Sequence, residues 1–185
     1  MPKPRANELS AAGRRGRNSK ARGHAAERAL AKLLSTGYGL PVKRIARSGA
    51  LKAQAEQMAG SANQYRGDLT LDLPDKSFRI EVKTRSVLPQ YVKRCRDILD
   101  YDAVEINQSV YVMTLDKFIG ALKTKDTLCI LTGQEKTIKA LEDWFAQDDS
   151  DVVIMKQTRE HTWYVAIHPE TLKEIRAGYN KYVNG

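Results

Sequence analysis

The chain has 185 residues, 42% hydrophobic and 29% charged, which is enough for one domain with a small extension. Its two cysteines fit no zinc-binding or disulfide spacing, and no apolar run is long enough to cross a bilayer, so disulfide scaffolds and membrane-spanning folds are excluded. The polar, basic amino-terminal residues lack the apolar segment of a secretory signal, and we expect an intracellular protein without a membrane partner.

Positive charge is concentrated at the amino-terminal end. Residues 1–52 hold 13 Lys and Arg and two Glu, a net charge of +11, whereas the whole chain has +9 and the remaining residues therefore sum to −2. This asymmetry favours binding of a polyanion, with nucleic acid first; a solubilising tail and an anionic membrane contact are the alternatives. Residues 1–20 have scarcely any large apolar side chain and are predicted to form a flexible basic arm.

A helix is predicted next, from about residue 19 to the glycines at 37 and 39, because small and apolar side chains recur there at helical spacing. Glu27 borders the apolar face. On local grounds it is interpreted as a first-turn glutamate that the helix dipole stabilises. His24 is interpreted as a contact to solvent or phosphate.

Residues 41–47, PVKRIAR, predict a first strand with alternating basic side chains, which Ser48 and Gly49 end. Residues 50–65 carry small and amide side chains, and either a short helix or a connecting loop fits them. As a loop, this segment is also a plausible place for a nucleic-acid strand to lie.

Two neighbouring strands, 68–73 and 78–84, are predicted around the turn at Pro74, and the rest of the chain is organised around them. Alternate side chains of a strand share a face, so pairing the two strands with their apolar faces aligned places Asp68, Glu81 and Lys83 on a common side. Two carboxylates and an ammonium group suit a divalent metal that activates water against a phosphodiester.

The rest of the chain alternates between helical and extended patterns. The predicted elements are a helix at 89–101, strands at 103–106 and 110–115, a helix at 116–123 capped by Asp116, a strand at 128–132, a helix at 135–146, strands at 152–157 and 162–167, and a helix at 169–182. The last five form a compact α/β appendage. Its acidic residues are interpreted as solvated helix ends instead of a second metal site.

Three segments, in their order and spacing, resemble the PD-(D/E)xK nuclease superfamily: a helix with Glu27, a strand that opens with Gly67 and Asp68, and a strand that ends with Glu81, Val82 and Lys83. Within it they look most like the archaeal-type Holliday junction resolvases and their phage relatives. The resemblance covers roughly residues 20–122, including the later run VYVMTLDKFIGAL. Gly67 stands where the motif has its proline.

The resemblance implies an α/β fold with a restriction-endonuclease-like core, a central mixed sheet flanked by helices, in residues 21–123. The disordered basic arm of residues 1–20 would precede it, and the small α/β extension of residues 124–185 would follow. It also implies a metal-dependent DNA endonuclease, structure-selective in the manner of a junction resolvase, in the cytoplasm of a bacterial, archaeal or phage-infected cell.

Roles for single residues follow from the same resemblance. Asp68 and Glu81 would bind Mg²⁺ or Mn²⁺ with the backbone carbonyl of Val82, and Lys83 would position the attacking water. Glu27 would act through a metal-bound water or by orienting Lys83. Ser48 would lie near the scissile phosphate. The residues expected to hold the DNA backbone are Arg14, Arg15, Arg17, Lys20, Arg22, Arg47 and Arg85. A site made of oxygen ligands does not favour zinc.

The expected partner is DNA, and a four-way junction would go with a two-fold homodimer that cuts paired strands symmetrically. Two alternatives stay open. One is a nucleic-acid-binding protein whose nuclease-like core no longer cuts, although such a protein has no need of carboxylates that repel phosphate. The other is an RNA-binding or ribosome-associated basic protein in which the nuclease-like pattern is coincidental.

Overall fold

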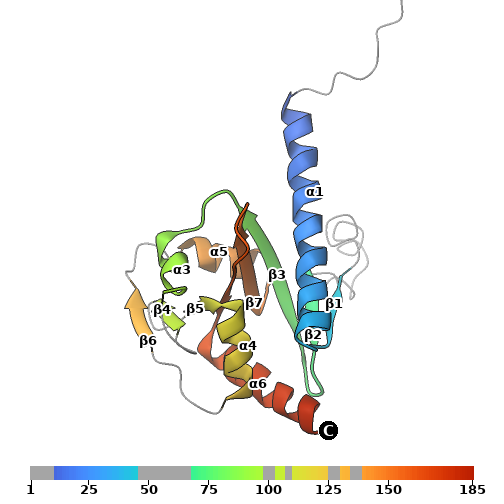
Figure 1. Ribbon diagram of the computed structural model, residues 1–185, viewed down its shortest axis with the longest axis vertical. Helices are drawn as coiled ribbons and strands as arrows, with labels where there is room; N and C mark the ends of the chain where they lie inside the picture. Colours follow the sequence, from blue (N-terminus) through green and yellow to red (C-terminus); the bar gives the residue numbers. More distant parts are fainter. Residues whose placement is uncertain (1–10, 46–67, 98–102, 107–109, 125–129, 134–138) are drawn as a thin grey trace, which may run out of the picture.

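The computed structural model describes residues 11–45, 68–97, 103–106, 110–124, 130–133 and 139–185, which form one mixed β-sheet with helices on both faces (Figure 1). Over these residues the sheet has eight strands in the order β1-β2-β3-β7-β8-β5-β4-β6. The strands are β1 (Val42–Arg44), β2 (Leu69–Asp72), β3 (Ser77–Arg85), β4 (Ala103–Ile106), β5 (Val110–Thr114), β6 (Ile130–Gly133), β7 (Val152–Gln157) and β8 (Trp163–Ile167). The helices are α1 (Ala11–Lys32), the π-helical turn η1 (Leu33–Gly37), α3 (Gln90–Arg94), α4 (Leu115–Lys123), α5 (Lys139–Asp148) and α6 (Pro169–Asn184).

The β2–β3 hairpin is the one that the sequence predicts. Its antiparallel register pairs Leu69 with Ile80 and Leu71 with Phe78, so the apolar side chains of both strands share one face. Strand β1 adds to the other edge of β2 and pairs Arg44 with Leu69. On its far side, β3 runs parallel to β7.

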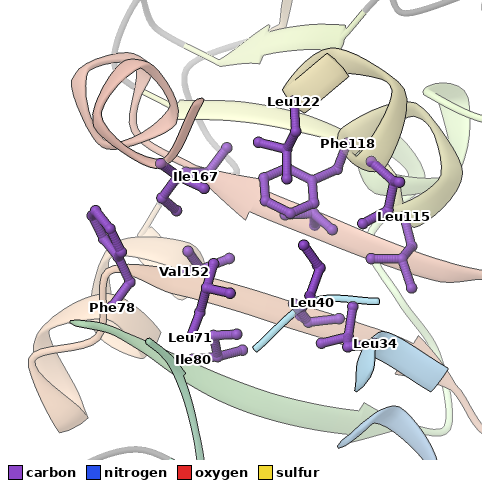
Figure 2. Close-up of a cluster of buried hydrophobic side chains, with 14 of the residues drawn as sticks. Leu34, Leu40, Leu71, Phe78, Ile80, Leu115, Phe118, Leu122, Val152 and Ile167 are labelled. Atoms are coloured by element: carbon purple, nitrogen blue, oxygen red, sulfur yellow. The ribbon is translucent and has the colours of Figure 1, made fainter. Parts of the chain in front are cut away.

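Two layers of buried side chains lie on opposite faces of the sheet. Strand β7 contributes to both, because Val152 and Ile154 face one layer while Val153 and Met155 face the other. Figure 2 shows the first layer, in which side chains of the sheet pack against α4 and the Leu34 region; α1 and α6 also contribute to this layer. The second layer packs against α3 and α5. The hairpin is therefore held by a strand that is buried on both faces.

The amino-terminal helix begins earlier than the sequence pattern predicts. Residues 11–20, expected to belong to the flexible arm, form the first turns of α1, and residues 1–10 lie outside the described part of the chain. The expectation rested on the lack of apolar side chains, but alanine and arginine are good helix formers without an apolar face. This end of α1 extends away from the sheet (Figure 1).

The carboxyl-terminal third differs from the expected appendage. Strand β7 pairs with β3, and β8 pairs with β7 and β5, so residues 124–185 belong to the same sheet, with β7 and β8 in its middle and β6 at its edge. The elements themselves were predicted closely: β7 has the expected bounds and α6 starts at the expected proline. Their pairing depends on contacts between strands that are far apart in sequence, which local patterns do not reveal.

The N-cap of helix α4 lies two residues earlier than predicted. Thr114 is its N-cap, and the Thr114 hydroxyl accepts a hydrogen bond from the backbone N–H of Lys117 at 3.4 Å. Asp116, the expected cap, lies in the first turn and accepts a hydrogen bond from the Tyr38 hydroxyl. No helix in the described ranges is both long and apolar enough to cross a membrane.

Candidate active site

Asp68 and Glu81 both lie at the open end of the β2–β3 hairpin. The last paired residues there are Leu69 and Ile80, so Asp68 is the residue before this pair on its strand and Glu81 is the residue after it on β3. The backbone N–H of Asp68 donates to the Ile80 carbonyl at 3.0 Å, which keeps the strands together at this point. The structure thus places the two carboxylate-bearing residues at the same end of the hairpin, and their shared binding of a metal stays a prediction.

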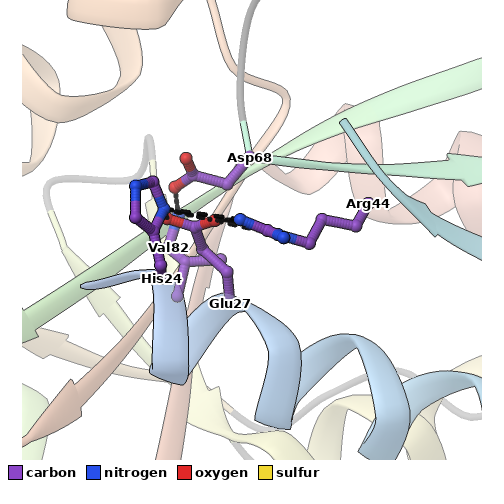
Figure 3. A network of polar contacts seen from close by, with 5 residues as sticks. All are labelled: His24, Glu27, Arg44, Asp68 and Val82. Atoms are coloured by element: carbon purple, nitrogen blue, oxygen red, sulfur yellow. Dashed lines mark hydrogen bonds and ion pairs between the residues drawn. The ribbon is translucent and has the colours of Figure 1, made fainter. Parts of the chain in front are cut away.

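The Asp68 carboxylate is fixed by the backbone of β3. Its Oδ2 atom accepts a hydrogen bond from the Val82 N–H at 2.9 Å (Figure 3). Such a bond orients the carboxylate and stabilises its charged form. The Val82 carbonyl, which the sequence suggested as a further ligand, belongs to the next peptide of the same strand.

Glu81 and Lys83 form an ion pair on one face of β3. The Lys83 ammonium donates to Glu81 Oε1 at 2.5 Å, and the two side chains are only 14% and 9% exposed. They share a face because they are two residues apart in a strand. Partial exclusion of water strengthens the attraction between these charges and keeps both groups at the hairpin end.

Glu27 lies on α1 and points toward β1. Its Oε2 atom accepts hydrogen bonds from Arg44 Nε at 3.1 Å and Nη2 at 2.9 Å, and His24 Nδ1 lies 3.0 Å from Oε1 (Figure 3). Because α1 begins at Ala11, Glu27 is not in its first turn, and the helix-dipole interpretation of this residue is wrong. His24, interpreted as a solvent or phosphate contact, has a carboxylate partner instead.

This polar network is connected to the hairpin end through β1. Arg44 pairs with Leu69 in the sheet, and the N–H of the next residue, Ile45, donates to the Asp68 carbonyl at 3.0 Å. Figure 3 shows Asp68 and its bond to Val82 beside the side chains of Glu27 and Arg44. Three elements that are separate in sequence therefore hold acidic side chains at one end of the hairpin.

The donor set fits an oxygen-preferring divalent cation. Two carboxylate residues, Asp68 and Glu81, lie at the same end of the hairpin, and Val82, whose N–H binds the Asp68 carboxylate, offers a backbone carbonyl there. Within the described ranges, no group of three or more His, Cys, Asp or Glu side chains is arranged to hold a metal. The arrangement thus offers two acidic ligands and leaves the remaining positions to backbone, water or substrate, as magnesium sites commonly do.

Several predicted residues lie outside what the structure describes. Ser48, Arg47 and Gly67 fall in residues 46–67, and the side chains of Arg14, Arg15 and Arg17 on α1 are likewise not described. Lys20 is exposed on α1. Arg22 and Arg85 are both exposed and line the same surface groove.

Arg44 is a residue of this site that the sequence analysis did not single out. The run PVKRIAR was interpreted as a strand with alternating basic residues, and its register against β2 was not considered. The signal was available in part: an arginine in a strand next to a helix that carries a partly apolar-facing glutamate is a natural ion-pair partner. Sequence alone did not show which of the three basic residues would face α1.

The part of the sequence that runs from α1 to α6 matches a known sequence family. A family model described as "phage putative PDDEXK endonuclease" matches residues 18–183. No curated protein matches the chain. The match covers the helix with Glu27, the hairpin with Asp68, Glu81 and Lys83, and also the strands β7 and β8 that the resemblance had left out. The mixed sheet flanked by helices is a restriction-endonuclease-like core, and this chain belongs to the PDDEXK endonuclease family.

Proposed function

We propose that this protein is a metal-dependent endonuclease that hydrolyses phosphodiester bonds in DNA at the hairpin end. The observation that supports it most directly is the position of Asp68 and Glu81 at the same end of the hairpin, with Lys83 paired to Glu81. Membership of the PDDEXK family supports the same reaction class, since nucleases of this superfamily use divalent metals.

Asp68, Glu81 and the Val82 carbonyl would hold Mg²⁺ or Mn²⁺. The bound ion supplies Lewis-acid chemistry at the phosphodiester. The chain's own groups do the rest: the Val82 N–H keeps the Asp68 carboxylate oriented, and Glu81 keeps the Lys83 ammonium beside it. Lys83 positions the attacking water and offsets negative charge at the phosphate. The product would carry a 5′-phosphate.

Glu27 takes a positioning role in this proposal. It holds Arg44, and through it the β1 strand whose Ile45 N–H binds the Asp68 carbonyl. The resemblance implied that Glu27 acts through a metal-bound water or by orienting Lys83, which pairs with Glu81; the contact with Arg44 adds a third possibility. Ser48 and Arg47 keep their proposed places near the scissile phosphate and the DNA backbone.

For the substrate we propose branched DNA, with a four-way junction as the leading form. The support is the similarity of the motif order and spacing to junction resolvases. A junction needs two symmetric cuts, so a two-fold homodimer belongs to this part of the proposal.

The test is cleavage of labelled linear, nicked, flap and four-way DNA, with magnesium and with EDTA, by the wild type and an Asp68→Asn variant. We expect magnesium-dependent cutting by the wild type, none by the variant, and DNA affinity that is unchanged or raised because a negative charge is lost. Asp72→Asn is a matched control, since Asp72 lies on the same strand at the other end and pairs with Lys43. It should still cut.

Cutting by Asp68→Asn under magnesium would refute the assignment of the site. Binding without cleavage of any of these substrates, insensitive to magnesium, would favour a non-catalytic nucleic-acid-binding protein. Preference for structured RNA over DNA junctions in competition would favour an RNA-binding role. If linear DNA is cut as fast as the four-way junction, the proposed preference for branched DNA is refuted, while the endonuclease assignment is not affected.

A further inference from the structure

We propose that a second element of this protein, the groove between α1 and the β7–β8 hairpin, binds the phosphates of one DNA strand as it leaves the hairpin site. We call it the basic groove; its charged lining residues are Arg22, Arg85, Lys156 and Arg159. This inference rests on the proposed function for the identity of the polyanion. The groove itself is defined by the structure.

The basic groove is an open depression of about 520 Å³. One wall is α1, where Ala25, Ala26 and Ala29 leave room because their side chains are small. The floor is the end of the sheet, where Lys156 pairs with Thr84 of β3 on one side and with Trp163 of β8 on the other. The volume is in the range of known ligand sites.

The charge of the lining has one sign. Four of the described residues around the groove are basic and none is acidic, although the chain beyond residue 52 is slightly acidic as a whole. Lys156 is held over the Trp163 ring, with its Nζ atom 5.1 Å from the ring centroid. That contact limits the freedom of the Lys156 side chain, because a lysine above an aromatic face has its stem fixed by packing.

Arg159 has an unusual backbone conformation for an arginine. Its φ is 74°, in the left-handed region, within the tight turn in which the Glu160 N–H bonds the Gln157 carbonyl at 3.1 Å. Glycine or asparagine would fit this position with less strain. An arginine that accepts the strain places a guanidinium at the groove, and strained residues of this kind cluster at binding sites.

The basic groove lies at the same end of β3 as the hairpin site. Thr84, which follows Lys83, lines it, and so does Ala26, which precedes Glu27. The turn of the β7–β8 hairpin is fixed to β3 at the same point, because the Thr158 N–H and hydroxyl both donate to the Arg85 carbonyl, at 2.7 and 3.1 Å. Lys83 aligns with Met155 and Thr84 with Lys156, so the groove and the Lys83 ammonium lie on opposite faces of the sheet at the same end of β3. A strand that passes around this end of β3 would meet both.

A polynucleotide strand suits this groove better than a compact anion. Arg22, Lys156 and Arg159 come from two elements, α1 and the β7–β8 hairpin, so their charges are distributed along an open surface instead of converging on one point. The Arg85 guanidinium lies over the Trp144 ring, 5.4 Å from its centroid, and only borders the groove. A chain of regularly spaced monoanions matches such a distribution, and each cation that neutralises a phosphate adds to the salt dependence of binding.

The experiment measures binding of the full-length protein to fluorescein-labelled single-stranded and duplex oligonucleotides by anisotropy, in EDTA, across a salt series. The variant is Lys156→Gln/Arg159→Asn, because asparagine accepts the positive φ of the turn. Lys123→Gln is the matched control, an exposed lysine in the last turn of α4 that does not line the groove. Circular dichroism checks folding, and Lys156→Gln/Arg159→Gly serves if the asparagine variant fails to fold.

We expect weaker binding by the double variant and a slope of log K against log salt that is less steep by about 1.4 to 1.8, which corresponds to two lost phosphate contacts. The Lys123 control should bind like the wild type. If the double variant and the Lys123→Gln control bind with equal affinity and an equal salt slope, the proposal that this groove binds DNA is refuted. Displacement of the oligonucleotide by a mononucleotide or inorganic phosphate at comparable concentration would also refute it, since a compact anion would then be the ligand.

Parallel cleavage assays separate this inference from the proposed function. If the wild type cuts DNA and the double variant binds and cuts like the Lys123 control, DNA binding by the groove is refuted and the proposed endonuclease function is supported. If no DNA is cut but the double variant loses affinity and salt dependence, the nuclease fails and the groove stands as a nucleic-acid-binding surface.

Discussion

Arg44 donates two hydrogen bonds to one oxygen of Glu27, at 3.1 and 2.9 Å, and so joins α1 to the edge strand of the sheet. The Glu27 side chain is 9% exposed and that of Arg44 33%. A carboxylate this deeply buried depends on its partner, because an unpaired charge away from water is costly.

Arg44→Met should therefore destabilise the protein by about 2 kcal/mol, less than the loss of a fully buried ion pair because Arg44 is one-third exposed. Urea unfolding followed by circular dichroism measures this. Glu27→Gln/Arg44→Met should be more stable than the sum of the single losses, since no charge is left unpaired. Lys173→Met, which breaks the exposed Lys173–Glu170 pair, should change stability by less than about 1 kcal/mol. If Arg44→Met loses no more stability than Lys173→Met, the structural role of Arg44 is contradicted.

Lys83→Met removes the ammonium group that pairs with Glu81. If Lys83 offsets charge at the phosphate, single-turnover cleavage should fall by about 10²-fold to 10³-fold with little change in DNA affinity. Lys83→Arg should recover part of the rate, because it restores the charge but not the compact ammonium geometry. Quench-flow or gel-based single-turnover assays at saturating protein check both. Full activity of the Met variant would exclude the proposed role.

Gly178 of α6 lies against Leu73 at the end of the β2–β3 hairpin. A Cβ atom at Gly178 would lie 3.0 Å from Leu73 Cδ1 and 3.1 Å from Leu73 Cβ. Gly178→Ala should destabilise by about 1 to 3 kcal/mol through overpacking. Gly23→Ala is the control with the opposite sign: nothing lies within 4 Å, and alanine in a helix interior should stabilise by about 0.5 to 1 kcal/mol. Thermal and urea unfolding compare the two, and a neutral or stabilising Gly178→Ala would show that α6 does not pack on the hairpin as described.

Tyr38 gives a prediction about pH. Burial, followed by the hydrogen bond and charge of Asp116, raises the pKa of Tyr38 from 10.0 to about 12. Between these two values the unfolded chain loses the phenol proton while the folded chain keeps it, so this residue's contribution to stability falls as pH rises from 10 to 12. The stability difference between wild type and Tyr38→Phe, from urea unfolding, should be constant below pH 9 and shrink above pH 10. A difference that grows over this range would contradict the assignment.

How far the sequence predicted the site depended on the distance between the residues involved. The alternation of β2 and β3 and their short turn were enough to predict the hairpin whose open end carries Asp68, Glu81 and Lys83, because a hairpin is a local structure. Arg44 was not found, since its partner on α1 is 17 residues away and the choice depends on which face of β1 meets the helix. Roles for the individual residues stay predictions.

The fold, like the site, was predicted where it depends on local sequence and not where it depends on contacts between distant segments. Individual strands and helices were predicted from periodicity, and β7 has the predicted bounds. The place of β7 between β3 and β8 could not be predicted locally, because a parallel pairing between residues 80–85 and 152–157 leaves no mark in either segment alone. The sequence analysis therefore did not place Lys156 and Arg159 near the β2–β3 hairpin. Lys156 of β7 pairs with Thr84 of β3, and Arg159 lies in the turn that follows β7.

The insertion of β7 beside β3 also sets the order of events during synthesis. The hairpin that bears Asp68 and Glu81 leaves the ribosome long before its neighbouring strand exists, and β3 has an unpaired edge until residues 152–157 have been made. An incomplete nascent chain lacks the strand that pairs with β3 on this side. On the proposed function, we therefore expect cleavage activity only after most of the polypeptide has emerged.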